Sequence, residues 1–338
     1  MLEKGADYAK IFISVIVTAH DRREFIIKAL DSIIKQTLSR DRYEVIVVKN
    51  YKDDKIDRYI EVNGFKSMVT NAVPVGAKLA MAIEMSNGNV VTVLEDDDEF
   101  TEGRLHAIYE VFMNTGDTTY FENMQIYINR DESTISRIDT LKNEGDIRIE
   151  NKGITPEEYT RLLRDPGGNA SCMAISKDIL VDHLEELRMI WRVPDTFILF
   201  LGFSHASFVV RDRRKLTRQR IHISATKLPD NLTRNAYLRE KYQREKRNYD
   251  DWRVIVNLTI ETNVYGIATL LFNHRKFLFL LYSKDRRSAV HSLKNILKLA
   301  GFLGIRNETF YLLAWAIYMV SPSFFGAFAY LHYRSSFT

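Results

Sequence analysis

Cysteine is almost absent from this sequence, which has a single one, Cys172, among its 338 residues. One cysteine cannot form an intrachain disulfide, and it cannot supply a cysteine-rich zinc site. The first twelve residues contain no long apolar stretch after a basic start, so we expect no signal peptide. These two absences favour a reducing, cytoplasmic location.

Charge of one sign is not in large excess either. The 48 lysines and arginines are balanced by 44 aspartates and glutamates, for a formal net charge of +4. This excess is too small to indicate nucleic-acid binding, so we expect no nucleic-acid partner. With 46% hydrophobic and 27% charged residues, the chain has enough material for one large globular domain and a smaller one.

The first hundred residues alternate between strand and helix patterns. Residues 13–18, 44–48 and 89–94 are short apolar runs rich in β-branched residues, which is typical of buried strands. Amphipathic helical segments stand between them. This alternation predicts a Rossmann-like α/β domain with a mainly parallel sheet. Asp21 and Glu24 have the spacing of a variant capping box, which would start the first helix.

Five consecutive acidic residues, 95–99, follow the third of these strands. In open α/β sheets, ligands bind beyond the carboxyl ends of the strands. Like charges at contact distance repel one another, so we expect a positive charge nearby, and Mg²⁺ or Mn²⁺ prefers carboxylate and phosphate oxygens. The alternative is a solvated loop whose carboxylates favour the N-terminus of the following helix. The spacing of the acidic residues alone does not decide between a metal site and a solvated loop.

Four motifs, in order along residues 12–226, resemble the family 2 glycosyltransferases, which have the GT-A fold. VIVTAHDRREFIIKALDSIIKQTL is similar to the family's opening strand and helix, and VTVLEDDDEFTEGRL to its strand, Asp-x-Asp motif and next helix. VPDTFILFLGF resembles the region of the catalytic base, and LTRQRIHISAT the element that closes the catalytic domain. The resemblance implies a catalytic domain over 1–226. It also implies an inverting, hexosyltransferase-class enzyme that uses Mn²⁺ or Mg²⁺ to move a sugar from a nucleotide-sugar to an acceptor hydroxyl.

The resemblance assigns the nucleotide-sugar to the ends of the first strands. Thr18, Ala19 and His20 would contact the nucleoside, and Arg22 would approach the diphosphate. Asn50 stands where the family usually has an aspartate that reads the base, and an Asn amide can both donate to and accept from a pyrimidine edge. A UDP-sugar is therefore favoured, with a GDP-sugar as the second candidate. Alternatively, His20 is a loop histidine that caps the helix, and Arg22 is solvated beside it.

Within the acidic run, the resemblance implies Asp97 as the principal metal ligand, with Glu95 in the first position of the Asp-x-Asp motif. Asp96 would bond the ribose or a metal-bound water. Asp98 would be a supporting or capping group. His222 would complete the metal shell or bond the diphosphate, and its alternative is a structural role at a strand end.

Asp195 is the residue that the resemblance implies as the catalytic base. It would take the proton from the acceptor hydroxyl, and burial between apolar neighbours would raise its pKa toward neutrality. Because it follows Pro194, its alternative role is the N-cap of the helix that follows. Asn169 and Ser171 would line the acceptor pocket, for a saccharide or a lipid-linked glycan.

Residues 227–338 change in character and predict a helical, basic and aromatic region. Residues 309–333 contain no Asp, Glu, Lys or Arg, which approaches the length of a membrane span. Ser321-Pro322 interrupts the run, so we expect two shorter helices that lie in the interface of an anionic membrane, peripheral on the inner face of the cell membrane. The alternative is that their apolar faces pack together or against another copy in a homo-oligomer.

Two other functions are open from the sequence. A sugar nucleotidyltransferase of similar architecture would need a glycine-rich loop after the first strand, but the loop at residues 18–22 has no glycine. A non-enzymatic lipid- or nucleic-acid-binding protein would leave the acidic run and Asp195 without a role.

Overall fold

The structure is a computed structural model that describes residues 12–134, 147–150, 168–221, 232–302, 321, 325–327 and 329–330. The chain divides into two compact units, of which the first comprises Met1–Ile154 and Asp165–His222, and the second Thr155–Arg164 and Ile223–Thr338. The domain boundary predicted near residue 226 lies outside the described residues.

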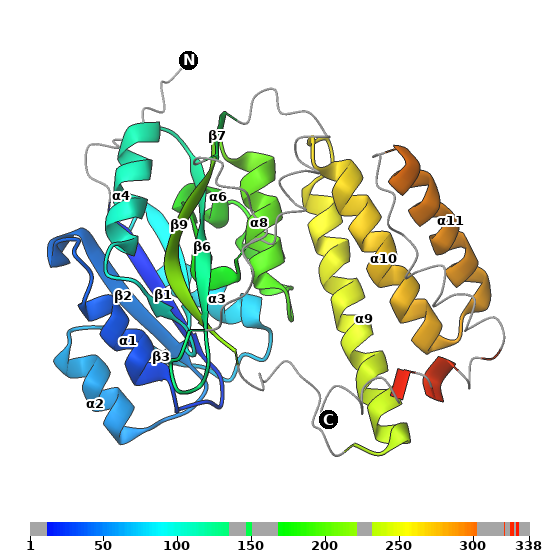
Figure 1. The fold of residues 1–338 in the computed structure, drawn as a ribbon, viewed down its shortest axis with the longest axis horizontal. Helices are drawn as coiled ribbons and strands as arrows, with labels where there is room; N and C mark the ends of the chain where they lie inside the picture. The colour runs from blue at the N-terminus through cyan, green and yellow to red at the C-terminus, as the bar shows by residue number, and fades with distance from the viewer. Residues whose placement is uncertain are drawn as a thin grey trace. The chain divides into compact units, whose positions relative to one another are not determined.

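The first unit is built on one sheet, which has nine strands in the described part of the chain (Figure 1). Their order is β3-β2-β1-β4-β8-β6-β9-β5, and β7 pairs with β9. Strands β1 to β4 run parallel, as do β6 and β9, while β8 is antiparallel to β4 and β6. The strands are β1 (Ile13–Ala19), β2 (Tyr43–Lys49), β3 (Lys66–Val69), β4 (Val90–Glu95), β5 (Glu99–Phe100), β6 (Thr119–Ile128), β7 (Ile147–Glu150), β8 (Met173–Ser176) and β9 (Phe208–Arg220).

Helices cover both faces of this sheet. The helices are α1 (Ile26–Ile34), α2 (Asp54–Val62), α3 (Val75–Met85), α4 (Arg104–Thr115), α6 (Lys177–Val181), α7 (Leu184–Arg188) and α8 (Pro194–His205). Val15 and Val17 of β1 share one core with apolar residues of α1, α2 and α4. Val91 and Val93 of β4 face a small apolar space that Leu79 of α3 and residues of α6 and α8 also line. Burial on both faces explains why the central strands are continuous apolar runs, and the predicted α/β fold with a mostly parallel sheet is confirmed.

The predicted capping box is wrong. Helix α1 begins at Ile26, its N-cap is Phe25, and no side chain caps it. Asp21 instead adopts a left-handed backbone conformation with φ 57°. Its carboxylate accepts from Asn50 Nδ2 and not from an amide of the first helical turn.

The main helices of the second unit are α9 (Arg234–Leu258), α10 (Tyr265–Ser283) and α11 (Arg286–Phe302). Tyr249 of α9 stacks on Phe272 and Phe279 of α10, with ring centroids 5.5 and 5.2 Å apart. In the segments that the structure describes, no helix is both long enough and apolar enough to cross a bilayer. Of the two helices predicted on either side of Pro322, the first lies outside the described residues, whereas residues 325–327 and 329–330 of the second are helical. Phe325 is buried with its ring 5.5 Å from that of Tyr282 in α10, which is the packing considered as the alternative to a membrane interface.

Candidate active site

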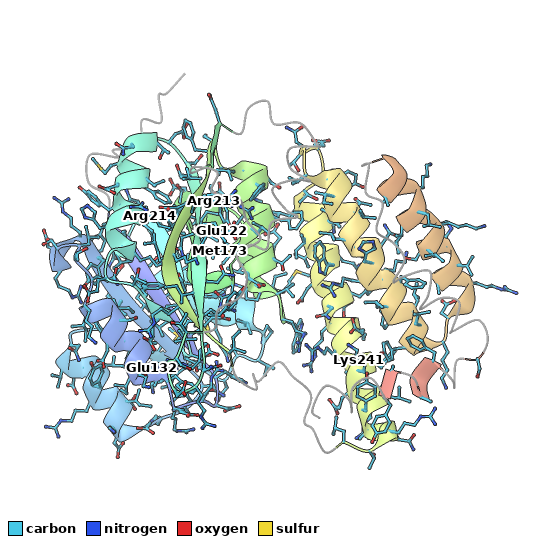
Figure 2. All side chains as sticks on the ribbon, viewed as in Figure 1. Glu122, Glu132, Met173, Arg213, Arg214 and Lys241 are labelled. Carbon is cyan, nitrogen blue, oxygen red and sulfur yellow. The ribbon has the colours of Figure 1, made fainter. Side chains whose placement is uncertain are left out.

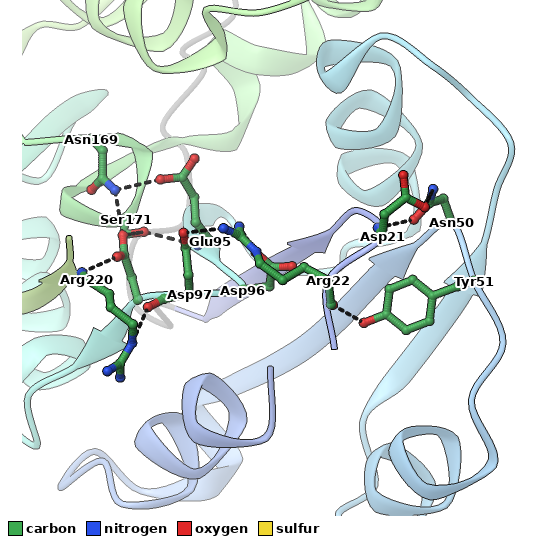
Figure 3. Close-up of polar contacts among 11 residues, drawn as sticks. Asp21, Arg22, Asn50, Tyr51, Glu95, Asp96, Asp97, Asn169, Ser171 and Arg220 are labelled. Atoms are coloured by element: carbon green, nitrogen blue, oxygen red, sulfur yellow. Dashed lines mark hydrogen bonds and ion pairs between the residues drawn. The ribbon is translucent and has the colours of Figure 1, made fainter. Parts of the chain in front are cut away.

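The candidate site lies where the carboxyl ends of β1, β2 and β4 meet. In the parallel registers, Thr18 of β1 lies opposite Glu95 of β4 and opposite Val48 of β2. Beyond β1, the Asp21 amide donates to Asn50 Oδ1 and the Asp21 carboxylate accepts from Asn50 Nδ2, both at 2.8 Å (Figure 3). The loops that the sequence analysis assigned to the nucleoside are therefore neighbours.

Glu95 to Glu99, hereafter the acidic loop, makes a tight turn at the end of β4. The Asp98 amide donates to the Glu95 carbonyl oxygen at 3.1 Å, which brings residue 98 back beside residue 95. Carboxylate oxygens of Glu95, Asp97 and Asp98 all lie within 4.8 Å of one another. Three convergent carboxylates form an oxygen donor set that suits Mg²⁺ or Mn²⁺. Asp98, expected from the sequence to have a supporting role, thus belongs to the group that could bind the ion.

Neighbouring segments hold the acidic loop in place (Figure 3). Asn169 Nδ2 donates to both Glu95 (2.6 Å) and Asp98 (2.5 Å). The Ser171 hydroxyl donates to Asp98 at 2.7 Å and accepts from the Glu95 amide at 3.1 Å. The Arg220 amide donates to the other Asp98 oxygen at 3.0 Å. Asn169 and Ser171, predicted to line the acceptor pocket, therefore lie against the acidic loop.

Arg22 supplies the positive charge that the acidic loop requires. Its guanidinium pairs with Asp96 and with Asp97, where Nη1 lies 2.7 Å from Oδ2. Burial raises the pKa of Asp96 to about 6, against the lowering effect of Arg22. The second Asp96 oxygen, Oδ2, is buried and has no hydrogen-bond partner within the described residues. A buried carboxylate oxygen left in this state is suited to accept from a ligand hydroxyl or a metal-bound water.

Burial also perturbs the other carboxylates of the loop. It raises the pKa of Asp98 to about 7, with the charge of Asp97 as the next cause. The pKa of Glu95 is raised well above its usual range by burial, and then by the charges of the loop and of Asp195. Carboxylates that resist ionisation on their own are stabilised in the charged form by a bound cation, so the site fits a divalent ion.

His20 faces a buried lysine. Lys78 Nζ lies 2.6 Å from His20 Nδ1, and burial lowers the pKa of both groups. A lysine ammonium can only donate, so Nδ1 accepts and the neutral ring carries its proton on Nε2. His20 lies six residues before the first helical residue, so the alternative that it caps α1 is wrong. Its ring is half-exposed, and Nε2 lies 3.4 Å from Asp21 Oδ2.

Lys49, the last residue of β2, is fully buried and donates to the Tyr51 carbonyl oxygen at 2.7 Å. It is therefore committed to the fold, and Asn50 is the polar side chain of this pair that remains at the sheet edge.

Asp195 lies in the first turn of α8. Pro194 is the first helical residue and Val193 the N-cap, so the N-cap role considered for Asp195 is wrong. Asp195 Oδ1 accepts from the Thr196 amide at 2.7 Å. Burial raises the pKa of Asp195, and its charge in turn raises the pKa of Glu95. The structure thus places Asp195 in the electrostatic environment of the acidic loop.

One predicted residue, His222, lies outside the described residues. One residue not foreseen is Arg220, whose side chain is fully buried, pairs with Glu99 and donates to the Asp97 carbonyl oxygen at 3.2 Å. Its guanidinium also lies 4.6 Å from the Phe25 ring centroid. Its acidic partner Glu99 lies 121 residues earlier in the chain, so no local pattern in the sequence indicates the pair.

A mostly parallel α/β sheet with an acidic loop at the end of its fourth strand defines a GT-A-type protein. The sequence matches the family model described as Glycosyl transferase family 2 over residues 14–184, about half of the chain, and the chain belongs to this family. No curated protein matches it in sequence.

Solved structures of S. aureus TarS have the same fold. TarS 1–349 in complex with UDP has a TM-score of 0.57 at 12% identity, over 86% of this chain and 81% of that one. TarS 1–349 in complex with UDP-GlcNAc has a TM-score of 0.52 at 12% identity, over 88% and 93%. Against the longer TarS chain the TM-score is 0.55 at 13% identity, over 80% of this chain but only 44% of that one. At such identities the likeness concerns the fold alone.

Proposed function

We propose that this protein is an inverting glycosyltransferase that transfers a sugar from a UDP-sugar to an acceptor hydroxyl, with Mn²⁺ or Mg²⁺ bound by the acidic loop. The observation that carries the proposal is the convergence of Glu95, Asp97 and Asp98 at the end of β4, in a family 2 chain. The complexes of TarS with UDP and with UDP-GlcNAc support a uridine nucleotide as the donor.

The residues around the acidic loop divide the work of donor binding. His20 and the Asn50 amide hold the nucleoside beside Thr18 and Ala19, and the free oxygen of Asp96 accepts from a ribose hydroxyl. Glu95, Asp97 and Asp98 hold the divalent ion, which neutralises charge on the leaving diphosphate when it is bound. Arg22, on the same side of the loop, shares that neutralisation.

Asp195 acts on the acceptor. Its carboxylate takes the proton of the acceptor hydroxyl while the hydroxyl oxygen attacks the anomeric carbon. The bond from that carbon to the diphosphate oxygen breaks on the opposite face, UDP departs, and the anomeric configuration inverts. The raised pKa of Asp195 suits it to accept a proton near neutral pH.

Nucleotide binding tests this proposal directly. UDP with Mn²⁺ should raise the melting temperature, whereas UDP with EDTA should raise it much less, because a ligand that binds only the folded state stabilises it. GDP with Mn²⁺ is the matched comparison, and a smaller shift is expected. If UDP and Mn²⁺ together leave the melting temperature unchanged, the donor site is wrongly assigned.

We further propose that 1–226 is the catalytic domain and that 227–338 binds an anionic membrane, peripherally on the inner face of the cell membrane. A saccharide or lipid-linked acceptor would be met there. Support comes from α11, where Arg287, His291, Lys294 and Lys298 are exposed and recur every three or four residues on one face. Over 262–302 the chain has seven lysines and arginines but only one acidic residue.

Charge reversal on α11 tests membrane binding. Lys294→Glu with Lys298→Glu should abolish flotation with phosphatidylserine vesicles at low salt, because each basic residue near such a surface contributes about 1 kcal/mol. Lys52→Glu with Lys55→Glu makes the same charge change on exposed side chains of the first unit and should leave flotation intact. Equal flotation by both double variants would rule out α11 as the contact. Light scattering on the same samples would reveal a homo-oligomer instead.

A further inference from the structure

A series of buried hydrogen bonds runs from α4 to the acidic loop. Arg104 Nε donates to Asn123 Oδ1 (2.9 Å), Asn123 Nδ2 donates to Thr217 Oγ1 (3.0 Å), and Thr217 Oγ1 donates to the Ser171 carbonyl oxygen (3.1 Å). The Ser171 hydroxyl then donates to Asp98 at 2.7 Å. All five residues are at most 2% exposed. They come from α4, β6, β9, the turn before β8 and the acidic loop.

The direction of these bonds is fixed by chemistry. A guanidinium can only donate, so Asn123 must turn its carbonyl oxygen toward Arg104 and its amide nitrogen toward Thr217. The Thr217 hydroxyl, having accepted, donates to the Ser171 carbonyl oxygen. The first three bonds therefore point from the buried cation to the Ser171 backbone, an arrangement in which neighbouring bonds polarise one another. The Ser171 hydroxyl, a separate group of the same residue, donates to Asp98.

Arg104 has an environment that packing alone does not explain. Its other hydrogen bonds to described residues go to neutral acceptors, Thr92 Oγ1 at 2.9 Å and the Met173 carbonyl oxygen at 3.3 Å, and its guanidinium lies 4.0 Å from the Phe100 ring centroid. Met173 pairs with Glu122 between β8 and β6, near the middle of the sheet (Figure 2). Burying a cation among neutral groups is costly. Through these bonds Arg104 ties together β6, β4, which ends in the acidic loop, and β8, which follows the turn that carries Ser171.

We propose that Arg104, Asn123 and Thr217 are positioning residues, which fix Ser171 and thereby hold the Asp98 carboxylate where it can bind the divalent ion. This inference rests on the proposed function, since the ion is the one assigned to the acidic loop. The loop carboxylates repel one another before an ion binds. The Ser171 hydroxyl counters that repulsion because it donates to the Asp98 carboxylate and accepts from the Glu95 backbone amide, which keeps the two residues in place. The Thr217 hydroxyl holds Ser171 itself by donating to its carbonyl oxygen.

The test removes the Thr217 hydroxyl and measures Mn²⁺ affinity. Groups bonded directly to metal ligands account for roughly 10–100-fold in affinity, and Thr217 is one link further away. Thr217→Val should therefore weaken Mn²⁺ binding in the presence of UDP by about three- to tenfold, measured by titration calorimetry. Thr217→Ser keeps the hydroxyl and should restore wild-type affinity.

Thr119→Val is the matched control. Thr119 is a threonine of β6 that is also fully buried and hydrogen-bonded, to Thr115 and to the Asp117 carbonyl oxygen, but lies outside the series. The Thr119→Val substitution should lower the melting temperature as Thr217→Val does, but it should leave Mn²⁺ affinity unchanged. Should Thr217→Val fail to fold, Thr217→Ala removes the same hydroxyl without the added methyl group.

The outcomes separate this inference from the function on which it rests. If wild type binds Mn²⁺ and Thr217→Val binds it equally well, the positioning role is wrong and the metal site stands. If Thr119→Val weakens Mn²⁺ binding to the same extent, the effect is general destabilisation, and the positioning role is again wrong. If wild type binds no Mn²⁺ with UDP present, the metal assignment and the inference are both lost.

Discussion

Asp195→Asn is expected to reduce kcat by about 10²–10⁴-fold, the range that general-base help typically supplies. The substitution keeps the shape of the side chain, and the amide oxygen can still accept from the Thr196 amide, but the group can no longer take a proton. Affinity for UDP with Mn²⁺ should remain close to that of wild type, because Asp195 is assigned to the acceptor. Single-turnover transfer measures the rate of the chemical step, and titration with UDP and Mn²⁺ measures donor affinity; both use the same preparation.

Asp178→Asn is the control for this substitution. Asp178 also lies in the first turn of a helix, α6, where a carboxylate stabilises the helix by roughly 0.3–1 kcal/mol. Asp178→Asn should lose this small amount of stability and keep turnover. Asp195→Asn should lose turnover without a larger loss of stability, because Asn removes the cost of burying the charge. A collapse of UDP affinity together with turnover would instead place Asp195 in the donor site. Unchanged turnover would remove it from the chemistry.

The central strands could be predicted because their signal is local. The runs at 13–18, 44–48 and 89–94 appear as β1, β2 and β4 with ends shifted by one residue at most. Continuous β-branched runs that are buried on both faces have little alternative to a parallel sheet. The same reasoning placed the acidic run at a carboxyl end of the sheet, where it lies.

The failures came from contacts between distant segments. The capping box at Asp21 and Glu24 has the right spacing, but Asp21 bonds Asn50, 29 residues away, and the helix begins later. The basic residues of 211–220 belong to one strand, β9, which continues to Arg220. A distant carboxylate neutralises part of this charge, since Glu122 Oε2 lies 2.9 Å from Arg211 Nε. No sequence window contains both partners of these pairs.

The role of Asp98 could not be read from the sequence for the same reason. Five adjacent carboxylates look alike in one dimension, and which of them converge depends on the turn that bonds Asp98 to the Glu95 carbonyl oxygen. It also depends on Asn169 and Ser171, more than 70 residues along the chain, which hold both side chains. The family resemblance indicated the position of the Asp-x-Asp motif, and the geometry shows that Glu95, Asp97 and Asp98 are the carboxylates that converge.

Asp97→Asn should abolish most metal-dependent transfer while leaving the metal-free protein folded. Loss of one of three carboxylate ligands removes charge stabilisation worth several kcal/mol, so we expect a fall in kcat/KM of at least about 100-fold. The increase in melting temperature produced by UDP and Mn²⁺ together should shrink in parallel. Thermal unfolding with and without both ligands, alongside initial rates, measures both effects.

The stability of the metal-free protein distinguishes a metal-ligand role of Asp97 from a purely structural role. Asp97 loses its pairing with Arg22, but the substitution also relieves repulsion from Glu95 and Asp98, and these opposing effects should change the metal-free melting temperature by no more than about 3 °C. A structural carboxylate would behave in the opposite way, with a large loss of stability and no loss of the Mn²⁺ response. Asp182→Asn, an exposed aspartate after α6, makes the same chemical change away from the loop and should alter neither quantity. A normal Mn²⁺ response in Asp97→Asn would mean that any bound ion is held without Asp97, whose carboxylate would then serve only to pair with Arg22.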